Sequence, residues 1–158
     1  MTRALTIILS FFAVCLALSA NTIQGKVVRV SDGDTITILD SANVQSKIRL
    51  NRIDAPEKSQ AYGNASKNHL SNLVAGKAVK VEWDKKDKYG RVLGDVSIDG
   101  VNVNLKMVQD GLAWHFKRFD NTPTYAQAEE EARAKKIGLW KDPDPIPPWE
   151  FRKGKKVK

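Results

Sequence analysis

The chain contains one cysteine and two histidines among 158 residues. The cysteine, Cys15, lies inside an apolar N-terminal segment that we expect to be removed, so the mature protein has no disulfide. The histidines, His69 and His115, lie on or beside apolar stretches and are predicted to have packing or surface roles. So few soft ligands exclude a zinc site. Without a disulfide, the hydrophobic core has to stabilise the fold by itself.

The apolar run Leu5–Leu18 is shorter than the roughly 20 residues that a membrane-spanning helix needs. Arg3 precedes it, and the small residues Ser19-Ala20 followed by Asn21 offer a cleavage site. We therefore predict that residues 1–20 are a signal peptide and that the protein is secreted or periplasmic, with no membrane anchor after cleavage. The alternative is a single uncleaved membrane anchor.

Removal of that segment leaves about 138 residues, which is the size of one domain and of an expected monomer. The full chain has 26 Lys and Arg residues against 18 Asp and Glu residues, a net charge of +8. Such an excess attracts polyanions such as nucleic acid, although a basic surface that serves only solubility is an equal alternative. We divide the mature chain into a domain over residues 21–140 and a Pro-rich, then basic tail over 141–158, predicted to be irregular and mobile.

Strand patterns dominate the first half of the chain. The expected strands are Thr22–Val30, Thr35–Leu39, Val44–Ile53, Val79–Trp83 and Val92–Ile98. Helical spacing of apolar residues predicts helices over Tyr62–Val74, from Val101 to Leu112, and from Thr122-Pro123 to Lys136. The order predicts a mainly β fold with α additions, a five-stranded OB-fold barrel with about three helices.

Three short motifs combine carboxylates with arginines. They are Asp32-Gly33-Asp34-Thr35, the segment Arg49–Glu57, and Asp87-Lys88-Tyr89-Gly90-Arg91. Carboxylate and carbonyl oxygens suit Ca²⁺ or Mg²⁺, and a guanidinium matches a phosphodiester in charge and shape. In a basic chain, this combination suggests metal-assisted cleavage of nucleic acid.

Each motif taken singly has a structural interpretation. Asp32 and Asp34 can simply build a hairpin turn, Arg49 can be an exposed cross-strand partner, and Tyr89-Gly90-Arg91 can end an ordinary turn. Their joint occurrence favours a site over these alternatives. For Asp32 we expect a supporting role beside the metal ligands.

The order DGDT, IRLNRIDAPE and DKYGR, followed by Gly111-Leu112-Ala113-Trp114 and Gly138-Leu139-Trp140, resembles the thermonuclease family, known from staphylococcal nuclease. The resemblance covers roughly Thr22 to Trp140. It implies an OB-fold, Ca²⁺-dependent nuclease that cuts DNA and RNA with little sequence specificity and leaves 3′-phosphate ends.

The resemblance also assigns roles to individual residues. Asp34 and Asp54 would be carboxylate ligands of Ca²⁺, with the main-chain carbonyl of Ala55 as a third ligand. Many relatives have threonine at the position of Ala55, and a main-chain oxygen survives that change. Glu57 would activate the attacking water. The scissile phosphate would be bound by Arg49 and Arg91, and the substrate also by Lys88 and Tyr89.

Family members often carry tyrosines near Phe116 and Phe119, where they touch the nucleotide. A phenylalanine can stack on a base but cannot donate a hydrogen bond, and core packing is an equal alternative for both rings. The remaining function classes are a nuclease, a non-catalytic OB-fold nucleic-acid-binding module and a structural envelope protein. The presence of all five key side chains favours the enzyme. The sequence does not rank DNA against RNA, or endonucleolytic against exonucleolytic cleavage.

Overall fold

Alternating β-branched residues form the first strands of the computed structural model, which describes residues 21–154. These strands are β1 (Asn21–Asp32), β2 (Thr35–Leu39) and β3 (Gln45–Leu50). In β2, Ile36 and Ile38 are fully buried because alternate side chains of a strand point to the same face. The predicted hairpin is therefore present, with one apolar face directed inward.

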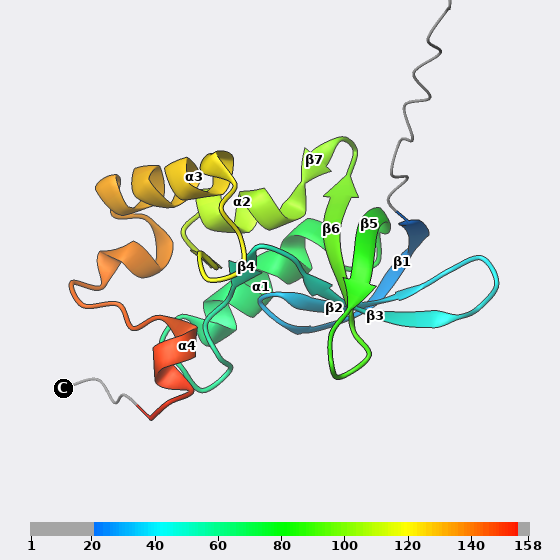
Figure 1. Ribbon diagram of the computed structural model, residues 1–158, viewed down its shortest axis with the longest axis horizontal. Coiled ribbons are helices and arrows are strands. Elements are labelled where there is room, and N and C mark those ends of the chain that lie inside the picture. The colour runs from blue at the N-terminus through cyan, green and yellow to red at the C-terminus, as the bar shows by residue number, and fades with distance from the viewer. Residues whose placement is uncertain (1–20, 155–158) are drawn as a thin grey trace, which may run out of the picture.

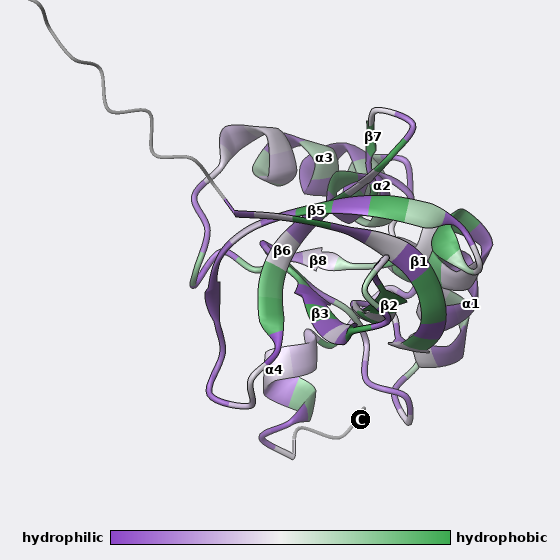
Figure 2. Ribbon diagram, turned by 90° about the vertical axis from the view of Figure 1, so that its right-hand side faces the viewer, coloured by the Kyte–Doolittle hydropathy of each residue, from purple (hydrophilic) through white to green (hydrophobic). Residues whose placement is uncertain are grey.

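Two further strands close the sheet into a barrel, as Figure 2 shows. Strand β1 pairs with β2 on one side and with β5 (Ala78–Lys86) on the other, and β5 pairs with β6 (Val92–Ile98). The parallel pairing of β3 with β6 completes the circle. The predicted mainly β barrel of five strands with helical additions is confirmed.

Glycine is required where β3 meets β6. A Cβ atom at Gly94 would lie 2.3 Å from Cγ1 of the buried Val81, so a larger residue would push into the barrel core. The register pairs Gly94 with Leu50, the last residue of β3. Glycine at this position thus leaves room for the side chain of Val81 of β5 in the barrel core.

The prediction of one strand from Val44 to Ile53 is wrong at its end. The chain turns at Asn51-Arg52, where Arg52 has a φ of 67°, and a separate short strand β4 (Ile53–Asp54) follows. Strand β4 leaves the barrel sheet and pairs with β8 (Trp114–His115). Because of this break, Asp54 does not pair within the barrel sheet and lies at the start of the loop that follows β4.

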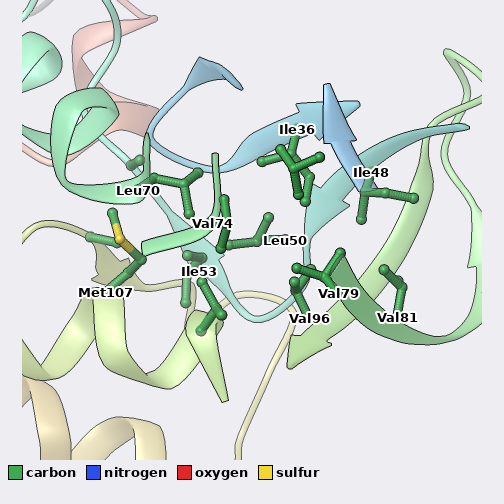
Figure 3. Close-up of a cluster of buried hydrophobic side chains, with 14 of the residues drawn as sticks. Ile36, Ile48, Leu50, Ile53, Leu70, Val74, Val79, Val81, Val96 and Met107 are labelled. Atoms are coloured by element: carbon green, nitrogen blue, oxygen red, sulfur yellow. The ribbon is translucent and has the colours of Figure 1, made fainter. Parts of the chain in front are cut away.

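Helices cover the open part of the barrel core. They are α1 (Gly63–Val74), α2 (Val103–Gln109) and α3 (Pro123–Ala134), and the short strand β7 (Val101–Asn102) precedes α2. Figure 3 shows Leu70 and Val74 of α1 and Met107 of α2 packed among the strand side chains, all of them buried. The three predicted helices are thus present, and a 3₁₀ helix η1 (Gly138–Lys141) and α4 (Pro148–Phe151) are added after them.

The C-terminal arm, residues 142–154, contains the short helix α4, so the prediction of an irregular arm is wrong over Pro148–Phe151. The ring of Trp149 stacks on Phe116 at 5.5 Å and meets Trp114 edge-on at 5.6 Å. Gln60 donates to the carbonyl of Ile146 at 2.6 Å. Figure 1 shows α4 beside the loop that follows β4. The basic residues near the C-terminus gave no sign that Trp149 would dock on the domain. A large aromatic ring gains enough free energy from burial to dock even where its neighbours in the sequence are charged.

Within residues 21–154, no helix has both the length and the apolar character needed to cross a membrane. The predicted signal peptide, residues 1–20, lies outside the described residues.

Candidate active site

All eight predicted site residues line one cleft of about 650 Å³. It opens between the turn joining β1 to β2, the loop after β4, and the turn joining β5 to β6. These residues are Asp34, Arg49, Asp54, Ala55, Glu57, Lys88, Tyr89 and Arg91. The barrel therefore brings together three motifs that are far apart in the sequence.

Two buried carboxylates lie at the base of the cleft. Asp34 is 6% exposed and Asp54 is 1% exposed. A single nitrogen of Arg49, Nη2, lies 3.1 Å from Oδ2 of Asp34 and 2.9 Å from Oδ1 of Asp54. The backbone N–H of Ala55 donates to Oδ2 of Asp34 at 2.7 Å, so the two predicted ligand segments are joined directly.

Asp32 stabilises the turn that carries Asp34. Its Oδ1 accepts a hydrogen bond from the backbone N–H of Asp34 at 3.1 Å, as aspartate commonly does in turns. A Cβ atom at Gly33 would lie 1.9 Å from Oγ of Ser66 on α1, so only glycine fits between this turn and the helix. Asp32 is thus placed to support Asp34.

Burial raises the pKa of Asp34 to about 7. Arg49 opposes this increase, whereas the nearby carboxylates of Asp32 and Asp54 add to it. Arg49 therefore does not offset the burial of Asp34 and the charges of the neighbouring carboxylates. A bound dication would add positive charge beside Asp34.

The donor set fits a hard cation. Residues 21–154 hold no group of three or more His, Cys, Asp or Glu side chains arranged as a metal centre. The base of the cleft holds two buried carboxylates, and Ala55, whose main-chain oxygen is the predicted third ligand, also lines the cleft. Ca²⁺ accepts carbonyl oxygens and completes irregular shells with water, so these residues suit calcium, whereas the preferred nitrogen and sulfur ligands of zinc are missing from the set.

Arg49 is fixed by four acceptors. Its Nη1 donates to the carbonyls of Leu50 at 2.7 Å and Ile53 at 2.9 Å, and its Nη2 meets both aspartates. The side chain is only 13% exposed. The guanidinium is thus held in one orientation at the wall of the cleft, which is the preorganisation that binding of a charged group requires.

Arg91 is oriented by an aspartate that the sequence interpretation left without a role. Asp87 accepts from Nε of Arg91 at 2.6 Å and from the backbone N–H groups of Arg91 and Tyr89. These hydrogen bonds and the charge of Arg91 lower the pKa of Asp87, although partial desolvation acts in the opposite direction. The contact at Nε fixes the plane of the guanidinium, whose terminal nitrogens are the donors suited to a phosphate.

Tyr89 lies at the rim of the cleft and is 73% exposed. The charged groups of Lys88 and Arg91 lie 5.0 and 5.6 Å from the centre of its ring. Such contacts between a cation and an aromatic face are weakly attractive and keep the ring beside the two basic groups.

Arg152 of the C-terminal arm also lines the cleft, and sequence reasoning missed it. Its Nη2 lies 2.7 Å from Oδ2 of Asp54, and its Nη1 lies 2.6 Å from Oε1 of Glu57. These two carboxylates raise the pKa of Arg152. In the sequence Arg152 is one of several basic residues near the C-terminus, and no local pattern distinguishes it from the others.

Phe116 and Phe119 both line the cleft, and their rings meet edge-on at 4.7 Å. Phe119 is 72% exposed, so the core-packing alternative is wrong for this residue. The two histidines do not line the cleft: His115 is buried beside Asp120, and His69 lies 2.7 Å from Asp110 on the surface.

The raised pKa of Asp34 predicts a pH-dependent stability. The folded protein binds the proton of Asp34 more tightly than the unfolded chain does. The contribution of protonated Asp34 to the free energy of unfolding is therefore fully present below pH 3.8 and is lost as the pH rises through about 7. In chelator, we expect the free energy of unfolding of the parent to fall between pH 5 and 8, relative to that of Asp34→Asn, by on the order of a few kcal/mol.

Denaturant titrations of both proteins at the two pH values measure this difference. Calcium added at pH 8 should restore the stability of the parent. Identical pH dependence of the two proteins would show that Asp34 titrates near its ordinary pKa.

Comparison with known sequences adds independent information. The family described as "Staphylococcal nuclease homologue" matches residues 47–142. A Haemophilus influenzae protein named "Uncharacterized endonuclease" is 46% identical over 153 residues, 97% of this chain and 86% of the relative. An Escherichia coli protein of the same name is 50% identical over 131 residues, 82% of this chain and 85% of the relative. A Shigella flexneri "Micrococcal nuclease" is 40% identical over 146 residues, 84% and 82% of the two chains.

Proposed function

Because this chain belongs to the staphylococcal nuclease family, we propose that it hydrolyses phosphodiester bonds of DNA and RNA in a calcium-dependent reaction that leaves 3′-phosphate ends. The names of the relatives support nuclease activity. The observation that carries the proposal is the single cleft in which two buried carboxylates, Glu57 and the arginines Arg49 and Arg91 meet.

Different residues of the cleft would bind the metal ion and the phosphate. Asp34, Asp54 and the carbonyl of Ala55 would hold Ca²⁺, which would neutralise charge that develops on the phosphate oxygens. Arg91, with its plane fixed by Asp87, would donate to those oxygens from its terminal nitrogens. Arg49 would supply a second positive charge from the cleft wall.

In this proposal Glu57 removes a proton from the attacking water. It lies in the loop directly after Asp54 and Ala55, and its side chain is 40% exposed, so water can reach it. The contact with Arg152 engages Oε1, while a carboxylate accepts hydrogen bonds through both of its oxygens. Glu57 can therefore act as a general base without losing this ion pair.

Cleavage assays test the proposal. Purified protein starting at Asn21 is incubated with plasmid DNA, single-stranded DNA or RNA, in Ca²⁺ or in chelator. We expect cleavage of all three in Ca²⁺. The products should accept a 5′-phosphate label directly, because their 5′ ends are hydroxyls, and a polymerase should extend them only after a phosphatase has removed their 3′-phosphates. Binding without cleavage in Ca²⁺ would instead favour the non-catalytic binding module.

We also propose that the protein is exported, because Arg3, the apolar run and Ser19-Ala20 form a signal-peptide pattern. The native protein is then expected to begin at or near Asn21. Intact-mass measurement of the protein isolated from its cells tests this. A mass that retains Met1–Leu18 would exclude a cleaved signal.

A further inference from the structure

A second hollow of about 620 Å³ adjoins the active-site cleft on the side of α3 and α4. We call it the α3–α4 groove. Its cationic lining residues are Lys117, Arg118, Arg133, Arg152 and Lys153. We propose that this groove binds the nucleic-acid strand beyond the scissile phosphate, an inference that rests on the proposed nuclease function.

The charge of the groove favours a polyanion. Its five cations face two carboxylates, Glu129 and Glu150, which leaves a net charge of +3. The side chain of Lys153 is 66% exposed and Arg118 is also exposed, so their charged ends reach solvent where a phosphate can approach. Lysine ammonium groups bind phosphates as point charges and release the counterions of the nucleic acid.

The groove is continuous with the cleft. Phe116 and Arg152 line both hollows and form the boundary between them. A strand whose scissile phosphate lies beside Arg91 can therefore pass over these two residues into the groove without leaving the protein surface. The docked arm forms this path, because α4 carries Arg152 at its end.

An aromatic wall accompanies the charges. Two half-buried rings, Phe116 and Trp149, are stacked with an interplanar angle of 12°, and Trp149 also meets the buried Trp114 edge-on. Aromatic rings beside basic groups are the usual means by which OB-folds hold single strands, since every base has a face that can stack. We therefore assign the groove to single-stranded nucleic acid.

Three of the five cationic residues also have other contacts in the fold or in the cleft. Substituting them would change more than the charge of the groove, so they are unsuitable for testing it. Arg133 lies over the ring of Trp140 at 3.9 Å, and Lys117 lies 2.7 Å from the buried carboxylate of Glu129. Arg152 belongs to the cleft as well. Arg118 is exposed and lies 5.6 Å from the ring of Phe119, and Lys153 has only a surface contact with Glu150 at 3.5 Å.

The test is the double variant Arg118→Gln and Lys153→Gln. Its matched control is Lys135→Gln, because Lys135 has the same 66% exposure as Lys153 and a similar surface pair, 3.7 Å from Glu131, but lies outside the groove. Binding is measured by fluorescence anisotropy in chelator, with labelled single strands of about 3 and about 12 nucleotides, the longer within the span of one OB-fold.

We expect the double variant to bind the longer strand about tenfold more weakly at low salt. The slope of log affinity against log salt should decrease by about 1.4, since each lost contact with a single strand removes about 0.7. The shorter strand should bind to the double variant as it does to the parent, and the control should match the parent with both strands.

An unchanged salt slope for the longer strand, or equal weakening of both strands, would overturn the groove assignment. The proposed function fails separately: a parent that shows the expected length-dependent binding but does not cleave in Ca²⁺ would keep the groove as a binding surface and remove the enzyme.

Discussion

Replacing Glu57 by glutamine is expected to reduce kcat by a factor of about 10²–10⁴, the usual contribution of a positioned general base. Glutamine has nearly the same shape but cannot take a proton from water. Calcium affinity and the KM for DNA should change little, because Glu57 lies outside the pair of buried carboxylates joined by Arg49. Steady-state cleavage of a fluorogenic oligonucleotide gives kcat and KM, and calorimetric calcium titration gives the calcium affinity.

The matched control is Glu82→Gln. Glu82 is an exposed glutamate on β5 that pairs with Lys80 and does not line the cleft, so its replacement should leave kcat at the parent value. Turnover by Glu57→Gln close to that of this control would remove Glu57 from the mechanism. It would direct attention to other groups of the same cleft as the source of the base.

Replacing Asp34 by asparagine is expected to weaken calcium binding by at least about tenfold and to abolish most activity at low calcium. Asparagine preserves an acceptor for the N–H of Ala55 but removes the negative charge. Ca²⁺ affinity depends strongly on the number of charged ligands, and this site offers only two buried carboxylates. Isothermal calcium titration measures the loss directly, without relying on the cleavage reaction.

Activity of Asp34→Asn should recover in part when calcium is raised, whereas Glu57→Gln should stay slow at every calcium concentration. Asp84→Asn is the control, because Asp84 is exposed on β5 and does not line the cleft. Equal calcium affinity of Asp34→Asn and the parent would show that Asp34 is not a metal ligand.

Much of the barrel could be predicted from the sequence. The pattern of β2, in which Ile36 and Ile38 are buried, depends only on the two-residue period of a strand. The turn at Asp32-Gly33-Asp34 and the proline at the start of α3 are local signals of the same kind. Local backbone preferences fix such features before distant segments meet, so they can be found in a short window of sequence.

The membership of the cleft could also be predicted, because the motifs themselves carry its carboxylates and arginines. The roles of these residues stay predictions, whereas their convergence is a property of the fold. The parallel pairing of β3 with β6 brings the strand that carries Arg49 beside the strand that follows Arg91. No local pattern predicts that pairing, since it joins segments separated by the helix α1 and the two strands β4 and β5.

What the sequence by itself determined was therefore the five strands of the barrel, the three longer helices, and the residue types available for metal and phosphate binding. Only the tertiary structure decided that the chain leaves the barrel at Arg52, that Trp149 docks on Phe116, and that Arg152 consequently reaches Asp54 and Glu57. The reason is physical. Stacking of rings and pairing of charges depend on where distant segments come to lie in space, and 98 residues separate Arg152 from Asp54 along the chain.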